Sequence, residues 1–142
     1  MFTRAHPTPA HPPAALQPLL FTPILKPKVW GGRRFESLGK PLPPKELIGE
    51  SWEMADLDQT SASGAGGAAE HSVVASGPLA GHSIREVVRT FGTDFLGHAR
   101  LSDWGGFPLL IKFLDAREHL SVQVHPSPAY LKAHAPAAGT KP

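Results

Sequence analysis

The most regular pattern of apolar and polar residues predicts a helix over residues 83–92, SIREVVRTFG. Ser83 suits an N-cap, and Glu86, three residues later, completes a capping box. The stretch TDFLG extends the helical pattern briefly to Gly97. The apolar residues recur at the spacing of a single helical face, namely Ile84, Val87, Val88 and Phe91. We therefore expect this helix to pack on a core and to carry no chemistry of its own.

A period of two residues predicts strands elsewhere in the chain. LIGESWEMADL at residues 47–57 alternates and sets Glu50 among apolar neighbours on one face. FPLLIKFLDA at residues 107–116 is mostly apolar, with Lys112 in its middle. HLSVQVHP at residues 119–126 alternates strictly. Its polar face carries Ser121, Gln123 and His125.

The link DAREH between the last two strands is short enough for a hairpin. Pairing these strands would place Lys112 on one face with the polar residues of 119–126. Upstream, Gly31-Gly32 predicts a turn or a close backbone approach, with Trp30 at its lip. Three shorter elements are also predicted. They are an edge strand or an extended segment at residues 19–25, a strand at 71–77 and a helical turn at 128–134.

Two stretches are too poor in large apolar residues to build a core. The Pro- and Ala-rich residues 1–18 predict a disordered arm. TSASGAGGAA, at residues 60–69, predicts a flexible loop spanning about 58–70. The expected domain is thus residues 19–142, mainly β, with a short helix around 83–97, and small enough to be part of a larger domain.

Charge and composition exclude several classes of protein. The formal net charge is +2, with no dense basic run, which argues against nucleic-acid binding. No stretch is long and apolar enough to predict a membrane span or a secretory signal. The chain has no Cys, which excludes disulfides and thiolate metal sites and fits a reducing cytoplasm. No protein partner is evident from the sequence.

Gln123 and His125 are the first candidates for chemistry. Two residues apart on a strand, they would lie about 6–7 Å apart on one face. Imidazole suits zinc, but a catalytic zinc needs three protein ligands, so spacing alone leaves two interpretations open: metal ligands or the polar face of a strand. Lys112 either extends its head group to water or meets an anion or hydroxyl of a substrate. Glu50 and Trp30 are each open to a structural or a pocket role.

FPLLIKFLDAREHLSVQVHP, residues 107–126, resembles the most recognisable segment of the type I phosphomannose isomerases. KPKVWGG and GESWEMA match two further segments of that family in the same order, and SVVASGPLAGHSIREVV fits the region between. The resemblance covers roughly residues 20–142, and the ordered combination of segments makes it specific.

The resemblance implies a cupin fold, a β-barrel or jelly roll with added helices, and one Zn²⁺ in the barrel mouth. It also implies interconversion of mannose 6-phosphate and fructose 6-phosphate, a reaction of carbohydrate metabolism. By matching position, Gln123 and His125 would be zinc ligands, and Ser121, Lys112, Trp30 and Glu50 would line the same substrate pocket. The implied candidates for proton transfer are Lys141, Glu50 and a zinc-bound water.

The sequence departs from the family at its end, Lys141-Pro142. In the family a Glu follows this Lys-Pro segment as third zinc ligand, and a later His is the fourth. The sequence therefore predicts the N-terminal part of an isomerase, with an incomplete barrel and ligand set, and an inactive fragment when alone. The alternatives are a non-catalytic cupin domain that binds a sugar or sugar phosphate, and a half-barrel completed by a partner chain.

Overall fold

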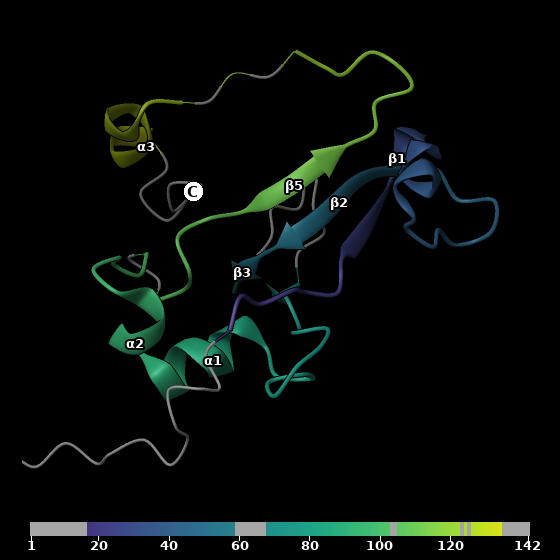
Figure 1. Cartoon of the computed structure of the whole chain (residues 1–142). Coiled ribbons are helices and arrows are strands. Elements are labelled where there is room, and N and C mark those ends of the chain that lie inside the picture. Colours follow the sequence, from purple (N-terminus) through teal and green to yellow (C-terminus); the bar gives the residue numbers. More distant parts are fainter. Residues whose placement is uncertain (1–16, 59–67, 103–104, 123, 125, 135–142) are drawn as a thin grey trace, which may run out of the picture. The chain divides into compact units, whose positions relative to one another are not determined.

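The computed structural model describes residues 17–58, 68–102, 105–122, 124 and 126–134, which fall into two compact units (Figure 1). The first unit contains the described residues up to Ile24 together with Trp52–Ile111. The second contains Leu25–Ser51 together with the described residues from Lys112 onward. Residues 1–16 of the predicted arm at 1–18 and residues 59–67 of the predicted loop at 58–70 lie outside the described residues.

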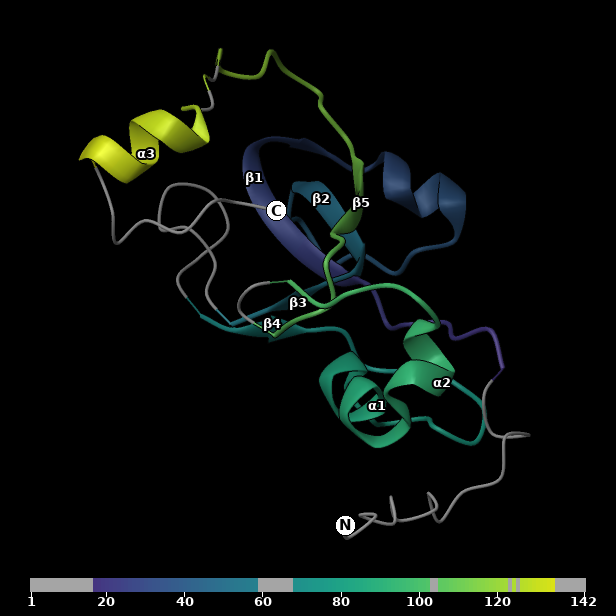
Figure 2. The same ribbon diagram turned by 90° about the vertical axis from the view of Figure 1, so that its left-hand side faces the viewer.

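The first unit contains helices α1, Ile84–Phe91, and α2, Thr93–Leu96. The predicted capping box is confirmed: the Ser83 hydroxyl accepts the Glu86 N–H at 3.2 Å, and the Glu86 carboxylate accepts the Ser83 N–H at 2.8 Å. Gly92, with a positive φ of 48°, separates the two helices. The helical pattern from 83 to 97 thus forms two short helices (Figure 2).

The predicted apolar face of α1 is also confirmed, since its four apolar residues are all buried. Val87 and Phe91 pack with Val74 and Leu79. On the other side of the stripe, Ile84 and Val88 pack with Met54. Fully burying a side chain of this kind stabilises a fold by about 1.5–3 kcal/mol, so the stripe is the main anchor of α1.

A two-stranded sheet lies in the same unit. Strands β3, Asp56–Leu57, and β4, Glu70–His71, pair antiparallel, with Asp56 opposite His71. The strand expected at 71–77 is reduced to β4 and two isolated bridges, which join Val73 to Ser83 and Val74 to Phe21.

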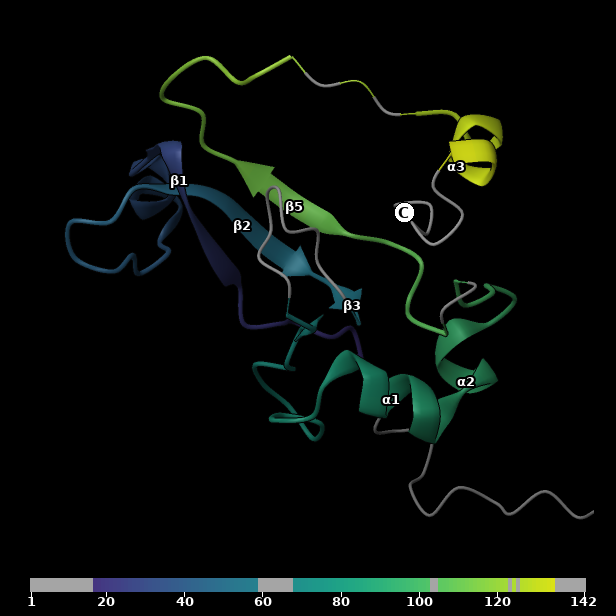
Figure 3. The same ribbon diagram turned by 180° about the vertical axis from the view of Figure 1, so that it is seen from behind.

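The second unit is built on a sheet with the order β1-β2-β5. Its strands are β1, Ile24–Gly32; β2, Ile48–Met54, which continues into the first unit; and β5, Ile111–Leu114. The central strand β2 runs opposite to both neighbours (Figures 1 and 3). A 3-10 helix, η2, Arg34–Leu38, follows β1 and ends at Gly39.

Gly31 and Gly32 lie within β1, so the predicted turn is wrong and the alternative, a close backbone approach, is confirmed. A Cβ on Gly31 would lie 2.5 Å from the backbone N of Gly49, closer than side-chain carbons approach other atoms. The two glycines let β1 and its neighbours approach with no side chain between them.

The strand predicted at 119–126 and its hairpin with β5 are wrong, because the described residues of that stretch form no strand. After β5, Ala116 bridges Gly31, and the N–H groups of Arg117 and Glu118 both donate to the Trp30 carbonyl. The chain therefore crosses to the end of β1 and does not reverse along β5. The predicted helical turn downstream is confirmed as α3, Pro128–His134.

Candidate functional site

Glu50 and Lys112 form an ion pair between the neighbouring strands β2 and β5. The Nζ of Lys112 lies 3.3 Å from Oε1 of Glu50. The Glu50 side chain is only 12% exposed, whereas Lys112 is 35% exposed. A carboxylate so deep in a sheet is stable only with a partner, and the partner's ammonium reaches solvent. Two residues that the sequence assigned to a pocket are therefore brought into contact.

Trp30 lies close by but makes a different contact. Its ring atom Cζ3 lies 2.6 Å from the place where a Cβ on Gly49 would be. Successive residues of a strand point to opposite faces, so this is the face opposite the Glu50 side chain. The structure thus does not bring the Trp30 ring together with the Glu50–Lys112 pair.

The remaining candidates follow β5. Ser121 is exposed and lies in the segment that forms no strand. Gln123, His125 and Lys141 lie outside the described residues. Within the part of the chain that the structure describes, no three His, Asp or Glu side chains are grouped so as to hold a metal ion.

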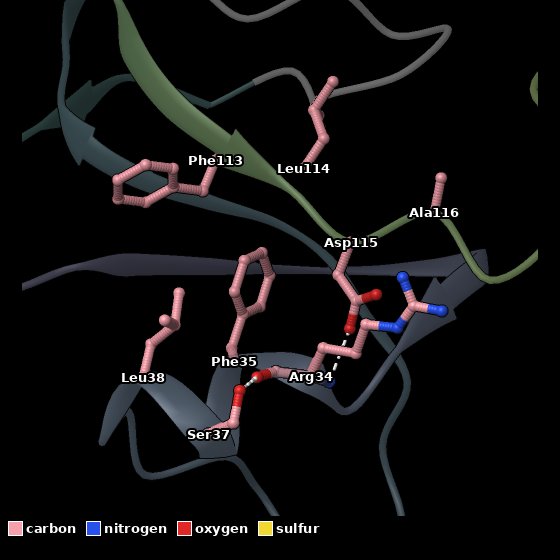
Figure 4. Close-up of a pocket in the computed structure, with 8 residues that line it drawn as sticks. All are labelled: Arg34, Phe35, Ser37, Leu38, Phe113, Leu114, Asp115 and Ala116. Atoms are coloured by element: carbon pink, nitrogen blue, oxygen red, sulfur yellow. Dashed lines mark hydrogen bonds between the residues drawn. The ribbon is translucent and has the colours of Figure 1, made fainter.

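A pocket that the sequence did not predict lies between η2 and the end of β5 (Figure 4). Its volume is about 260 Å³, and its apolar lining includes Phe35, Leu38 and Phe113. Asp115, only 4% exposed, accepts the backbone N–H of Arg34 at 2.6 Å. Its second oxygen is fully enclosed and has no hydrogen-bond partner among the described residues. Asp115 thus fastens η2 to the sheet and offers no accessible oxygen to a ligand.

A second buried carboxylate organises the first unit. Asp56, fully buried, accepts hydrogen bonds from Nδ1 of His71 at 2.7 Å, Nε of Arg85 at 2.9 Å and the Phe107 N–H at 2.7 Å. Desolvation disfavours the charged form of Arg85, but hydrogen bonds to Asp58 and Asp56 outweigh it and raise the pKa of Arg85. Nη2 of Arg85 is buried without a hydrogen-bond partner among the described residues. The other donors, including Nη1 of Arg85 at 2.9 Å from Asp58, are engaged with carboxylates, so we interpret the cluster as structural.

The fold is mainly β with a few short helices, and the described residues form no closed barrel. It resembles the crystal structure of the mannose 6-phosphate isomerase from Bacillus subtilis with a TM-score of 0.61 and 30% sequence identity. The alignment covers 84% of this chain and 33% of that one. The structure is therefore of the cupin type, as the sequence predicted.

Residues 19–140 match the catalytic domain of type I phosphomannose isomerases. The chain belongs to this family, whose members are isomerases, and corresponds to the N-terminal part of its relatives.

Curated relatives agree with this assignment. The probable mannose-6-phosphate isomerase GmuF of Bacillus subtilis is 35% identical over 117 residues, 82% of this chain and 33% of GmuF. Mannose-6-phosphate isomerase ManA of the same organism is 34% identical over 83% of this chain, and that of Streptococcus mutans is 35% identical, also over 83%. This chain spans about a third of the length of each. None of its described helices is long and apolar enough to cross a membrane.

Proposed function

We propose that the whole protein is a zinc-dependent isomerase that interconverts mannose 6-phosphate and fructose 6-phosphate, and that this chain supplies part of its active site. Family membership supports the reaction class. The observation that carries the assignment to this site is the Glu50–Lys112 pair, because it joins a buried carboxylate and a solvent-reaching cation that the resemblance places in the pocket.

The reaction moves a proton between C1 and C2 of an open-chain sugar phosphate. It needs a group that accepts and returns the proton and a positive charge near the oxygen that becomes negative. The carboxylate of Glu50 is suited to the first task, with Lys141 as the other candidate. The ammonium of Lys112 is suited to the second, since it is held beside Glu50 and still reaches solvent. Ser121 and Trp30 are proposed pocket residues.

The proposed zinc ligands are Gln123 and His125. An imidazole and an amide oxygen suit zinc in kind, but they are one donor short of the three that a catalytic zinc needs. The described residues contain no group of three His, Asp or Glu side chains that could hold a metal ion on its own. When bound, the zinc would act as a Lewis acid on substrate oxygens.

A chimera tests this proposal. This chain replaces the matching N-terminal third of Bacillus subtilis ManA, and isomerase turnover and zinc content are measured on the purified chimera. We expect turnover with about one zinc per molecule. His125→Ala should lose both, whereas His134→Ala, in α3, should lose neither.

A chimera without zinc or turnover would contradict the proposal. A chimera that binds mannose 6-phosphate in calorimetry without turnover would favour the alternative, a non-catalytic domain that binds a sugar phosphate.

A further inference from the structure

The register of β5 against β2 decides which face each side chain of β5 takes. Because side chains of a strand alternate between faces, a shift of one residue would move Lys112 to the face opposite Glu50. The pattern of β5 does little to prevent such a shift, since each face carries an apolar residue. Phe113 lies on one face, and Leu114 lies beside Lys112 on the other. The register must therefore be fixed by a contact outside this pattern.

Asp115, the residue that follows β5, is held from two sides. Its N–H donates to the carbonyl of Gly49, the neighbour of Glu50 on β2, at 2.9 Å. Its carboxylate accepts the backbone N–H of Arg34 at 2.6 Å, just beyond the end of β1 (Figure 4). This one residue therefore ties β5 both to β2 and to the end of β1.

A shifted register would lose the hydrogen bond to the carboxylate. One residue in either direction, Leu114 or Ala116 would take the place of Asp115, and neither side chain has an acceptor. The part-buried Arg34 N–H would then lack the partner that it has here, which is costly for a backbone donor. The carboxylate thus favours one register of β5 over its neighbours.

The chain beyond Asp115 depends on the same contact. The N–H groups of Arg117 and Glu118 donate to the Trp30 carbonyl at 2.9 and 3.3 Å. These two donors follow Asp115 directly, so a shift at Asp115 would move them away from Trp30.

We propose that Asp115 is a positioning residue: its hydrogen bond from the Arg34 N–H fixes the register of β5 and thereby holds Lys112 against Glu50. The effect on catalysis rests on the proposed function, in which Lys112 stabilises negative charge, whereas the effect on register does not. A residue that only fastened η2 to the sheet would change stability alone.

Variants of the ManA chimera test the proposal. Asp115→Ala removes the acceptor and should lower kcat at least about tenfold with KM within about threefold, because the displaced Lys112 no longer meets the charge of the transition state. Asp115→Asn keeps one acceptor oxygen and replaces the oxygen that has no partner among the described residues. Its kcat should stay within about threefold of wild type. Equal losses of kcat in the two variants would overturn the proposal.

Ser72→Ala is the matched control. The buried Ser72 hydroxyl accepts the backbone N–H of Ala55 at 2.8 Å in the first unit, so this variant also removes a side-chain acceptor from a backbone donor. It should lower the denaturation midpoint in urea and leave kcat within about twofold of wild type. A loss of kcat as large as that of Asp115→Ala would assign both losses to general destabilisation and overturn the proposal.

A double variant tests whether Asp115 acts through Lys112. Lys112→Met should itself lower kcat, and adding Asp115→Ala should lower it by no more than about a further twofold. Losses that multiply in full would show that the two residues act independently, which contradicts the proposal.

Hydrogen exchange separates this inference from the proposed function. In Asp115→Ala the amides of Arg117 and Glu118 should exchange at least about tenfold faster than in wild type, while Ser72→Ala leaves them unchanged. Circular dichroism checks folding, and Asp115→Leu, which fills the space without an acceptor, replaces Asp115→Ala if that variant is unfolded. A wild-type chimera without turnover would contradict the proposed function and leave the exchange rates to decide the register. Unchanged exchange at both amides in the folded variant would overturn the inference, whatever the turnover.

Discussion

The carboxylate of Asp115 occupies the space that a side chain on Gly32 would need. A Cβ at Gly32 would lie 2.6 Å from Oδ2 of Asp115, the oxygen that accepts the Arg34 N–H. One position earlier, a Cβ on Gly31 would meet the backbone of Gly49. The end of β1 is therefore fixed by contacts that only glycine permits.

Gly31→Ala should lower the free energy of unfolding by about 2–3 kcal/mol, because backbone atoms cannot move aside as a side chain can. Gly39→Ala is the control: a Cβ there meets open space, and only its φ of +73° opposes the substitution, which costs about 1 kcal/mol. Urea denaturation measures both. Equal losses would show that the close approach at Gly31 is not tight.

Glu50→Gln in the ManA chimera should reduce kcat by about 100-fold or more if Glu50 moves the substrate proton. Stability should change by less than about 1 kcal/mol, since Lys112 is partly solvated and its ion pair is screened. Glu53→Gln, on the same strand, is the matched control and should leave kcat unchanged. A kcat within threefold of wild type for Glu50→Gln would assign Glu50 a purely structural role (about 0.6 kcal/mol in barrier).

Asp56→Asn should destabilise the chain by about 3 kcal/mol. The amide keeps one acceptor oxygen for three donors and leaves the partly buried Arg85 cation without its fully buried counter-charge. Asp58→Asn removes a carboxylate that is half exposed and should cost at most about 1 kcal/mol. Chemical denaturation separates the two; similar losses would argue against the central role of Asp56.

The capping box of α1 predicts a pH dependence. Hydrogen bonds from the Ser83 N–H and hydroxyl lower the pKa of Glu86 from its ordinary value of 4.5. Because the folded-state pKa lies below the unfolded one, this stabilisation is complete above pH 4.5 and is lost as the pH falls through the lower, folded value. Circular dichroism should show more helix in the wild type than in Glu86→Gln above pH 4.5. On acidification the two helix contents should become equal once the pH lies below the folded-state pKa of Glu86. Parallel curves would contradict the prediction.

The elements that the sequence predicted correctly are those determined by residues close to one another in the sequence. The helix α1 follows from Ser83, Glu86 and an apolar stripe, all within one short segment. The segment 119–126 has an equally regular pattern, yet its described residues form no strand. Just before it, the N–H groups of Arg117 and Glu118 donate to the distant carbonyl of Trp30. Alternation predicts the two faces that a strand would have, but contacts with distant parts of the chain decide whether the strand forms.

The same distinction applies to the site. The resemblance named Glu50 and Lys112 as pocket residues, but their contact depends on β2 and β5 being adjacent, which no local pattern reveals. Asp115 and Asp56 were missed because a single aspartate has no periodic signal. Their partners include backbone N–H groups, those of Arg34 and Phe107, whose position follows only from the folded chain.

The hydrogen bond between Arg34 and Asp115 spans 81 positions and closes the second unit. During synthesis, β1 and β2 emerge from the ribosome well before β5. The third strand of the sheet is therefore absent until the whole α1 region has been made. Helix α1, whose contacts are mostly local, can form during that interval. The layout of the chain therefore predicts that Asp115 can reach the end of β1 only after the α1 region has been made.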